Sequence, residues 1–222
     1  MEVIKDQIPK VKFALALSGG FDSVGVCLYL KRHKHDFVCF HANNQLIPYD
    51  NEAQSKVEDL CKTLELELFV HTNEKPYESG SVEEFARKHR IRAFNELAVK
   101  TGIVDVISAH NLADAITSYL WCAFRGKIDH IPIPISTNFG DFTVRRPFVL
   151  AKKEELKRWV ITNDCQNFVS NDPLNDNLAL NRNFLGKKLL PLIQERNFNL
   201  ERVVAKIMRK KILELNEKNV KV

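Results

Sequence analysis

The sequence predicts an α/β protein with a doubly wound, mostly parallel sheet, followed by a helical C-terminal segment. Over the first two-thirds of the chain, short apolar runs rich in β-branched residues alternate with longer amphipathic stretches. This alternation is typical of a parallel sheet with helices on both faces, and right-handed crossovers make such a sheet doubly wound. From residue 151 onward only helical periodicity remains. Ligands of such sheets bind beyond the carboxyl ends of the strands, so the residues that follow each strand matter most.

Strands and helices are predicted in the following order. Four apolar runs are predicted strands, at 12–17, 37–41, 66–71 and 104–109. Helical periodicity predicts helices at 22–34, 51–64, 82–101, 151–162, 178–195 and 199–217. Residues 127–150, rich in Pro and β-branched residues, predict a strand or hairpin that closes the sheet. The Asn- and Asp-rich segment 163–177 predicts either ordered turns or a mobile flap.

Length and composition indicate one compact globular unit. The 222 residues can bury well over half of the surface that the unfolded chain exposes. Apolar residues make up 45% and charged residues 27%, which excludes disordered and low-complexity classes. No apolar run reaches the ~18 residues of a membrane span, and the N-terminus lacks the apolar core of a secretory signal. The five cysteines are scattered without a CxxC pair, which argues against a zinc knuckle and suggests a reducing, cytoplasmic compartment.

Positive charge gathers at the C-terminal end. Residues 185–222 carry ten Lys or Arg and four Glu, whereas the other 184 residues carry 23 basic and 24 acidic side chains. A neutral body with a basic tail predicts a polyanionic partner such as nucleic acid, and a merely solvated helix face is the alternative. The last predicted helix also has an apolar face, so we expect it to pack on the body and leave its basic side open.

The segment 18–23, SGGFDS, follows the first predicted strand directly. Two glycines let the backbone turn sharply and approach a ligand closely. The helix that follows offers free N–H groups and a dipole that favours an anion, and two serine hydroxyls add donors. The spacing differs from both GxxxxGK[ST] and GxGxxG. The alternative is a plain strand–helix turn in which Ser or Asp caps the helix.

Three charged or titratable residues stand near the predicted strand or helix ends. His110, just past the fourth strand, suits contact with a phosphate or a structural role. Asp114 would attract a substrate ammonium or complement the dipole of its own helix. Arg182 opens a helix behind an acidic loop and suits bidentate binding of a phosphate. The alternative for Arg182 is an ion pair with Asp172 or Asp176.

Two further groups stand out, one on the predicted helix 82–101 and one in the segment YLWCAFRG at 119–126. Arg87 and Arg90 are i, i+3 neighbours on one face, which suits contact with RNA phosphates. Trp121 and Phe124 are expected to fill the core rather than to stack on a base. The full set of expected RNA contacts is Arg87, Arg90, Asn183, Lys187, Lys188, Arg209, Lys210 and Lys211.

Six segments, taken in order, resemble the tRNA(Ile)-lysidine synthase family of the PP-loop, or N-type ATP-pyrophosphatase, superfamily. They are SGGFDS at 18–23, HANNQL at 41–46, EEFARKHRI at 83–91, AHNLADAITS at 109–118, RPFV at 146–149 and the DPLNDN-to-LLPLI run at 172–193. The resemblance spans about 12–193 and describes a compact, diverged member. It implies a PP-loop domain over 1–165, with a basic helical extension over 166–222 packed on it.

The resemblance implies a ligase that cleaves ATP between its α- and β-phosphates, adenylates a base oxygen and lets an amine displace AMP. The base would be the wobble cytidine of tRNA(Ile), joined at C2 to lysine, with ATP and Mg²⁺ as cofactors and tRNA and a small amine as partners. The implied ATP contacts are Ser18, Gly19, Gly20, Phe21, Asp22, Ser23 and His41. The implied catalytic residues are Asp22, which would also orient the phosphates through the metal, His110, Asp114, which would also bind lysine, and Arg182. A capping role is the alternative for Asp22.

Four positions depart from the family pattern. Asn111 replaces a His, Gly186 replaces an Arg, Leu46-Ile47 lacks the Arg of the family's HGLR run, and Thr117 replaces a Glu that helps to hold lysine in the family. Asp114 is then the one carboxylate where the family has two, which leaves the amine open. The alternatives are a PP-loop enzyme that serves a different nucleophile, by amidation or thiolation, and a non-catalytic nucleotide-binding module.

Overall fold

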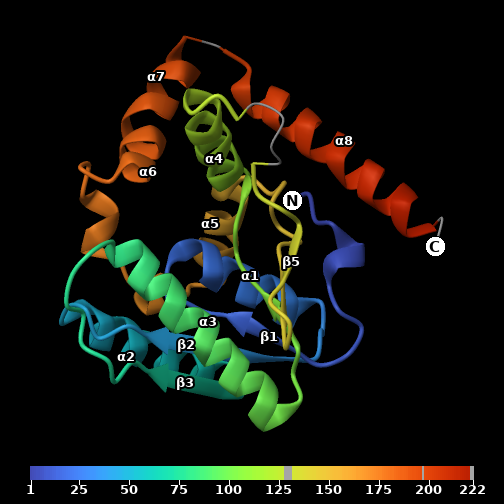
Figure 1. Ribbon diagram of the computed structural model, residues 1–222. Coiled ribbons are helices and arrows are strands. Elements are labelled where there is room, and N and C mark those ends of the chain that lie inside the picture. The colour runs from blue at the N-terminus through green and yellow to red at the C-terminus, as the bar shows by residue number, and fades with distance from the viewer. Residues whose placement is uncertain (128–131, 197, 221–222) are drawn as a thin grey trace.

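A six-stranded sheet of order β3-β2-β1-β4-β6-β5 runs through the molecule (Figure 1). Its strands are β1 (Phe13–Ala16), β2 (Phe37–Asn43), β3 (Leu68–Thr72), β4 (Asp105–Ile107), β5 (Ser136–Asn138) and β6 (Thr143–Arg145). Neighbouring strands are parallel except for β5 and β6, which pair antiparallel. The predicted fold class is therefore confirmed. The order changes direction between β1 and β4, and a ligand crevice is expected at this point of a doubly wound sheet.

The computed structural model describes residues 1–127, 132–196 and 198–220, and for Asn175 and 215–220 it describes the backbone alone. The helices are α1 (Phe21–Arg32), α2 (Tyr49–Thr63), α3 (Val82–Thr101), α4 (Leu112–Phe124), α5 (Lys153–Thr162), α6 (Asn181–Phe184), α7 (Leu190–Glu195) and α8 (Leu200–Val220). Shorter turns are η1 (Lys5–Gln7), η2 (Gln166–Phe168), η3 (Pro173–Asp176) and the π-helical turn η4 (Leu185–Leu189). No helix in the described ranges is both long enough and apolar enough to span a bilayer.

Most predicted elements are present, with shifted ends. The predicted hairpin in 127–150 is the β5–β6 pair at the sheet edge, although 128–131 lie outside the described residues. The predicted helix 178–195 is made of α6, η4 and α7 in succession. Segment 163–177 forms ordered turns, η2 and η3, rather than the alternative of an unstructured flap.

Two apolar cores cover the two faces of the sheet. Side chains of β1 alternate between them, because successive residues of a strand point to opposite faces. Phe13 and Leu15 pack in the core that α1, α2 and α5 cover, whereas Ala14 packs in the core beneath α3. Helices α1 and α5 approach closely at Gly25, where a Cβ would lie 2.5 Å from the Leu156 carbonyl oxygen. Gly25 therefore allows α5 to lie against α1.

A third core joins the C-terminal helices to the body. Val204, Met208 and Ile212 of α8 pack against α4, including Leu112 and Ile116, and Met208 is fully buried. Figure 1 shows α8 lying across this side of the molecule, with α6 and α7 beside α4. The apolar face predicted for the last helix thus packs on the body. The boundary at 165/166 itself remains a prediction.

Candidate functional site

The segment 18–23 forms the turn between β1 and α1, at the carboxyl end of the central strand. Gly19 has φ +87°, a left-handed conformation that glycine adopts without strain. Its carbonyl accepts a hydrogen bond of 2.9 Å from the backbone N–H of Ser170, and a Cβ here would lie 2.6 Å from Ser170 Oγ. The turn therefore depends on a glycine at this position and on a segment far along the chain.

The first turn of α1 leaves its backbone donors available. Gly20 occupies the N-cap position, and no side chain accepts a hydrogen bond there. Ser23 Oγ donates to the Gly20 carbonyl at 3.0 Å and lies 3.1 Å from Ser18 Oγ. Phe21 faces the Lys157 ammonium, which lies 5.4 Å from its ring centroid. Free N–H groups and a helix dipole at one point favour an anion such as a phosphate.

Asp22 is the carboxylate of this turn, and it is not a capping residue. Its Oδ2 lies 4.0 Å from Lys153 Nζ of α5, while its buried Oδ1 has no hydrogen-bond partner among the described residues. Burial raises the pKa of Asp22 to about 6, and the nearby Asp114 carboxylate contributes in the same direction. A carboxylate oxygen that is buried and unpaired normally costs stability, which makes Asp22 Oδ1 a candidate ligand-binding atom.

The loop after β4 places His110 and Asp114 beside this turn, at the point where the strand order changes direction. Asn111 and Asp114 form a capping box on α4, in which Asp114 Oδ2 accepts a hydrogen bond of 3.0 Å from the Asn111 backbone N–H. His110 Nδ1 lies 2.8 Å from Ser108 Oγ. Burial lowers the pKa of His110 to about 4, so the imidazole is neutral at pH 7. Asp114 therefore caps its own helix through Oδ2, which leaves Oδ1 free to contact another residue.

Arg182 reaches this second oxygen from the far end of the chain. Its Nη2 donates to Asp114 Oδ1 at 2.7 Å. The predicted alternatives, Asp172 and Asp176, are not its partners, since Asp176 pairs with Lys187. The Arg182 side chain is 54% exposed, so it remains accessible to a ligand. Arg182 and Asp114, two separate candidates in the sequence, are thus in contact in the structure.

Other cations surround the pair. Desolvation lowers the pKa of Arg90, and the positive charges of Arg182 and Arg87 lower it further. After burial, the Asp114 carboxylate raises the pKa of His110, and the positive charges of Arg146, Arg182 and Arg90 lower it. No carboxylate of the described residues lies within ion-pair distance of Arg90. Positive charge thus exceeds negative charge here, which suits a polyanionic ligand.

His41 supports the turn from beneath. Its side chain is 4% exposed, and Nδ1 lies 2.8 Å from the carbonyl oxygen of Leu17, the residue that precedes Ser18. Burial lowers the pKa of His41. A neutral imidazole that donates to this carbonyl fixes the entry to the turn, and its contact with ATP remains a prediction.

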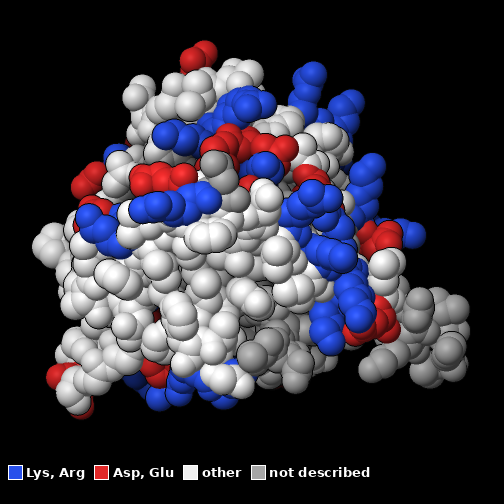
Figure 2. All heavy atoms as spheres, turned by 90° about the horizontal axis from the view of Figure 1, so that it is seen from above, with Lys and Arg blue, Asp and Glu red and all other residues white. Residues whose placement is uncertain are grey.

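The predicted RNA contacts fall into two groups. Arg209 of α8 donates from Nε and Nη2 to Glu2 at 2.8 and 2.6 Å, and Lys211 lies 3.3 Å from Glu214. Lys187 and Lys210 also have acidic partners, and Asn183 donates to the Leu174 and Asn177 carbonyls. Lys188, Arg87 and Arg90 have no ion-pair partner among the residues described. Figure 2 shows this mixture, with acidic side chains among the Lys and Arg on the face seen from above.

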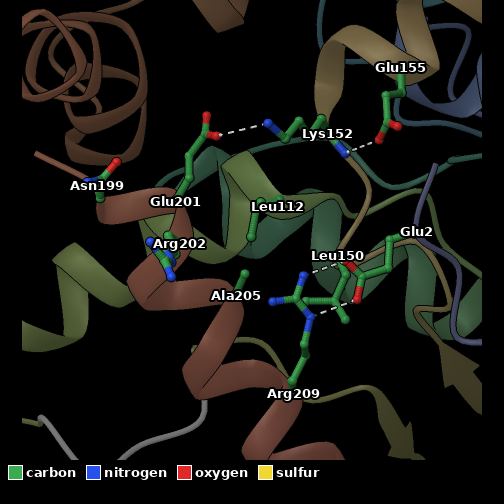
Figure 3. Close-up of a pocket in the computed structure, with 10 residues that line it drawn as sticks. All are labelled: Glu2, Leu112, Leu150, Lys152, Glu155, Asn199, Glu201, Arg202, Ala205 and Arg209. Atoms are coloured by element: carbon green, nitrogen blue, oxygen red, sulfur yellow. Dashed lines mark hydrogen bonds and ion pairs between the residues drawn. The ribbon is translucent and has the colours of Figure 1, made fainter. Parts of the chain in front are cut away.

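An open cavity of about 410 Å³ lies apart from the turn, between α8 and the starts of α4 and α5. Figure 3 shows Arg209 pointing to Glu2 and Lys152 pointing to Glu201, so that ion pairs span this cavity. Lys152 and Glu201 lie 3.6 Å apart. These contacts fasten α8 to the N-terminus and to α5.

Two residues that touch the turn carry no sequence signal, and two aromatic residues predicted in the core lie outside it. Ser170 and Lys153 touch the turn, but neither belongs to a recognisable motif, and Ser170 acts through tertiary contact alone. Trp121 and Phe124 were expected in the core, yet they are 39% and 66% exposed. This expectation was wrong because the last turn of α4 projects beyond the apolar contacts that bury its first half.

Relatives with known names share most of the chain. A tRNA(Ile)-lysidine synthase from Mycoplasma mycoides is 32% identical over 84% of this chain and 46% of its own length. Those from Pseudothermotoga lettingae and Thermus thermophilus are 26% and 28% identical over 90% and 89% of this chain. They are covered over 45% and 39% of their own lengths, so the chain spans less than half of each of these relatives.

Solved structures share the fold at low sequence identity. The U34-tRNA thiolase NcsA of Methanococcus maripaludis superposes with a TM-score of 0.76 at 13% identity, over 94% of this chain and 74% of its own. The NH3-dependent NAD synthetase of Campylobacter jejuni gives 0.51 at 19% identity, over 90% and 84%. The family profile described as PP-loop domain matches residues 1–193, and with the turn at 18–23 in place the chain belongs to the PP-loop domain family.

Proposed function

We propose that the chain carries out ATP-dependent ligation on a tRNA base, by adenylation of a base oxygen followed by attack of an amine. The amine is lysine and the base is the wobble cytidine of tRNA(Ile), as the names of the relatives suggest. The observation that carries the proposal is the meeting of three groups at one edge of the sheet. They are the open N-terminus of α1, the unpaired oxygen of Asp22 and the Asp114–Arg182 pair.

The chemistry of Asp22 fits a Mg²⁺ ion. Mg²⁺ prefers oxygen ligands and usually binds one or two carboxylates together with substrate phosphates. Asp22 Oδ1 is a buried carboxylate oxygen without a partner, and no three His, Cys, Asp or Glu side chains of the described residues gather into a metal site. Asp22 would thus hold the ion jointly with the phosphates of ATP. When bound, Mg²⁺ would offset the negative charge that develops on the leaving pyrophosphate.

The turn at 18–23 would hold the phosphates. The backbone N–H groups of the first turn of α1 have no capping acceptor at this position, and Ser18 would turn its hydroxyl from Ser23 Oγ to a phosphate oxygen. Donors that are already oriented stabilise developing charge without reorganising during the reaction. Lys153, 4.0 Å from Asp22, supplies a further positive charge at the same place.

Asp114 would bind the amine once Arg182 moves. In the free protein both oxygens of Asp114 are engaged, one by the Asn111 backbone N–H and one by Arg182. Arg182 also matches a phosphate, which it can bind in bidentate fashion. When Arg182 turns to the phosphate of the nucleotide or the adenylate, Asp114 Oδ1 becomes available to an ammonium group. This exchange predicts that amine binding follows nucleotide binding.

A pyrophosphate-release assay tests the proposal. The chain is incubated with ATP, Mg²⁺ and a tRNA(Ile) transcript, with and without lysine, and labelled lysine in the RNA is counted. We expect pyrophosphate release that depends on tRNA, and lysine in the RNA with matching stoichiometry. A transcript in which the wobble cytidine is replaced by uridine is the matched control. Absence of AMP and pyrophosphate with every tRNA would contradict the proposal and favour a non-catalytic nucleotide-binding module.

A second candidate keeps the ATP chemistry and changes the amine. Thr117, one turn after Asp114, directs its hydroxyl to the Ala113 carbonyl at 2.8 Å and brings no charge to the site. Lysine carries two amino groups that can both be positively charged. A site with one carboxylate attracts such an amine more weakly than a site with two. Scanning amino acids and ammonia in the same assay separates the candidates. Mass spectrometry of the nucleosides identifies the product, whether lysidine, another amidated base or a thiolated one.

A further inference from the structure

We infer that the end of α4 is a stacking site for an unpaired RNA base, formed by Trp121, Phe124 and Arg125. It would hold a nucleotide near the one that reacts at Asp114. The inference rests on the proposed function, since it names the part of the protein that receives the loop of the RNA.

The aromatic rings at this end of α4 are open to solvent. Trp121 is 39% exposed and Phe124 is 66% exposed. The Arg125 guanidinium lies 5.4 Å from the centroid of the Trp121 ring, within the range of a cation–π contact. Unpaired RNA bases stack on aromatic rings and on arginine guanidinium planes, whatever the base. Because Arg125 lies next to Trp121, an aromatic ring and a guanidinium plane are available to a base at the same place.

The position on α4 connects these rings to the site. Trp121 follows Asp114 by seven residues, so it lies on the same face of the helix, about 10 Å further along. Thr117 lies between them on that face, and its Oγ1 is 3.5 Å from the Cβ that a side chain at position 186 would have. The middle of this face therefore packs against η4, the turn that carries Lys188, and Thr117 is buried there. An unpaired RNA loop would pass over η4 between Asp114 and Trp121.

The charge around the rings favours RNA over an apolar protein segment. From 115 to 128 the chain has no acidic residue, and Arg125 and Lys127 follow the aromatic residues directly. Lys127 and Lys188 are both exposed. Cations next to an exposed ring suit a base together with its phosphate, whereas an apolar protein surface would bury such cations at a cost.

Tryptophan fluorescence offers a direct test, because the chain has two tryptophans, Trp121 and Trp159. Trp159 packs edge-on against Tyr29, with ring centroids 5.6 Å apart, and can be replaced by Phe. In the Trp159→Phe chain, Trp121 is the one indole that reports. The tRNA(Ile) anticodon stem–loop is titrated in, beside the same hairpin with abasic nucleotides in its loop. We expect quenching by the intact loop and none by the abasic loop.

Affinity supplies the second measurement. Trp121→Ala is expected to weaken binding of the stem–loop by about 5- to 150-fold, the range for loss of one base–aromatic stack. Trp121→Phe keeps a ring and should restore most of the affinity. Val99→Ala, which trims an exposed apolar side chain at the end of α3, is the control and should bind as the unmodified chain does.

The outcomes separate this inference from the proposed function. RNA binding without quenching, together with unchanged affinity in Trp121→Ala, overturns the stacking site and leaves the ligase proposal standing. Equal quenching by the abasic loop also overturns it, because the ring would then report phosphate contact alone. Failure of the unmodified chain to bind any RNA overturns both. Loop-dependent quenching with ring-dependent affinity supports the stacking site.

Discussion

The carboxyl edge of the sheet and the C-terminal helix α8 are both rich in charge, but they hold it differently. On α8, Arg209 is clamped by Glu2 through two hydrogen bonds, and Lys210 and Lys211 lie beside Glu214. At the sheet edge, one oxygen of Asp22 has no partner among the described residues, and Arg90 has no carboxylate there either. On α8 the cations Arg209, Lys210 and Lys211 have acidic partners, whereas Asp22 Oδ1 and Arg90 at the sheet edge have none among the described residues.

This difference assigns different roles to the two regions. Compensated pairs between segments far apart in the chain hold a helix in place, and such exposed pairs contribute modestly to stability. Uncompensated buried groups cost stability and persist where a ligand needs them. Positive charge in the sequence therefore does not mark the RNA surface by itself, and the presence or absence of acidic partners is the better guide.

The largest effect is expected from Asp22→Asn, which removes the charge of the carboxylate whose Oδ1 has no partner among the described residues and keeps the shape of the side chain. We expect pyrophosphate release to fall by about 10³-fold, as for loss of a major electrostatic stabiliser. Folding should not suffer, because the buried charge opposes it. Comparison of kcat and of thermal melting for both chains checks this, and a destabilised, fully active variant would contradict the assignment.

The pH dependence of stability sharpens the same comparison. The pKa of Asp22 is about 6 in the folded chain and is raised from 3.8 by burial, so the folded state retains a proton that the unfolded state loses. Stability of the unmodified chain relative to Asp22→Asn should therefore fall as the pH rises from about 4 to about 6, and stay level above. Allowing for partial solvent screening, the difference is about 1–2 kcal/mol. Denaturant melts of both chains across this range measure it.

Arg182→Ala comes next, since it removes one member of the Asp114–Arg182 pair. Loss of the guanidinium that would bind a phosphate should lower the rate of pyrophosphate release by about 10²-fold. Asp114 would then bind an amine without prior nucleotide, so the order of binding should disappear. Arg182→Lys, which keeps the charge and loses the bidentate geometry, is the matched variant and should restore activity in part. Equilibrium binding of lysine with and without a non-hydrolysable ATP analogue decides the point.

Salt dependence of RNA binding separates the two kinds of cation. Lys188→Ala, which removes a side chain without an acidic partner among the described residues, should flatten the slope of log affinity against log salt by about 0.7. Arg209→Ala should leave the slope unchanged, because Glu2 already neutralises Arg209. If Lys188→Ala and Arg209→Ala changed the salt slope equally, cations with and without an acidic partner would not differ in RNA binding.

The smallest effect is expected for folding of the Arg209→Ala chain. Loss of the bidentate pair should lower the free energy of unfolding by about 0.5–1 kcal/mol. Glu2→Gln and the double variant complete a cycle that isolates the coupling between the two residues. A coupling near zero would mean that the apolar contacts of Met208 and its neighbours hold α8 by themselves.

The sequence predicts local features well and tertiary contacts poorly. Apolar runs and helical periods predicted the sheet, since strand faces and helix faces follow directly from side-chain spacing. The turn at 18–23 was recognisable because its glycines and serines are contiguous. The contact of Ser170 with Gly19, and of Arg182 with Asp114, joins segments more than 60 residues apart, and no local pattern encodes it. Trp121 was misjudged because apolar character alone does not tell a buried ring from an exposed one.

The hydrogen bond between Gly19 and Ser170 can form only after most of the chain has been synthesised. The turn at 18–23 leaves the ribosome early, but Ser170 is added about 150 residues later. At about 5–20 residues per second, this separation is on the order of ten seconds. Through this interval the nascent chain has the segment 18–23 without the hydrogen bond from Ser170. A turn made early in synthesis is thus completed late.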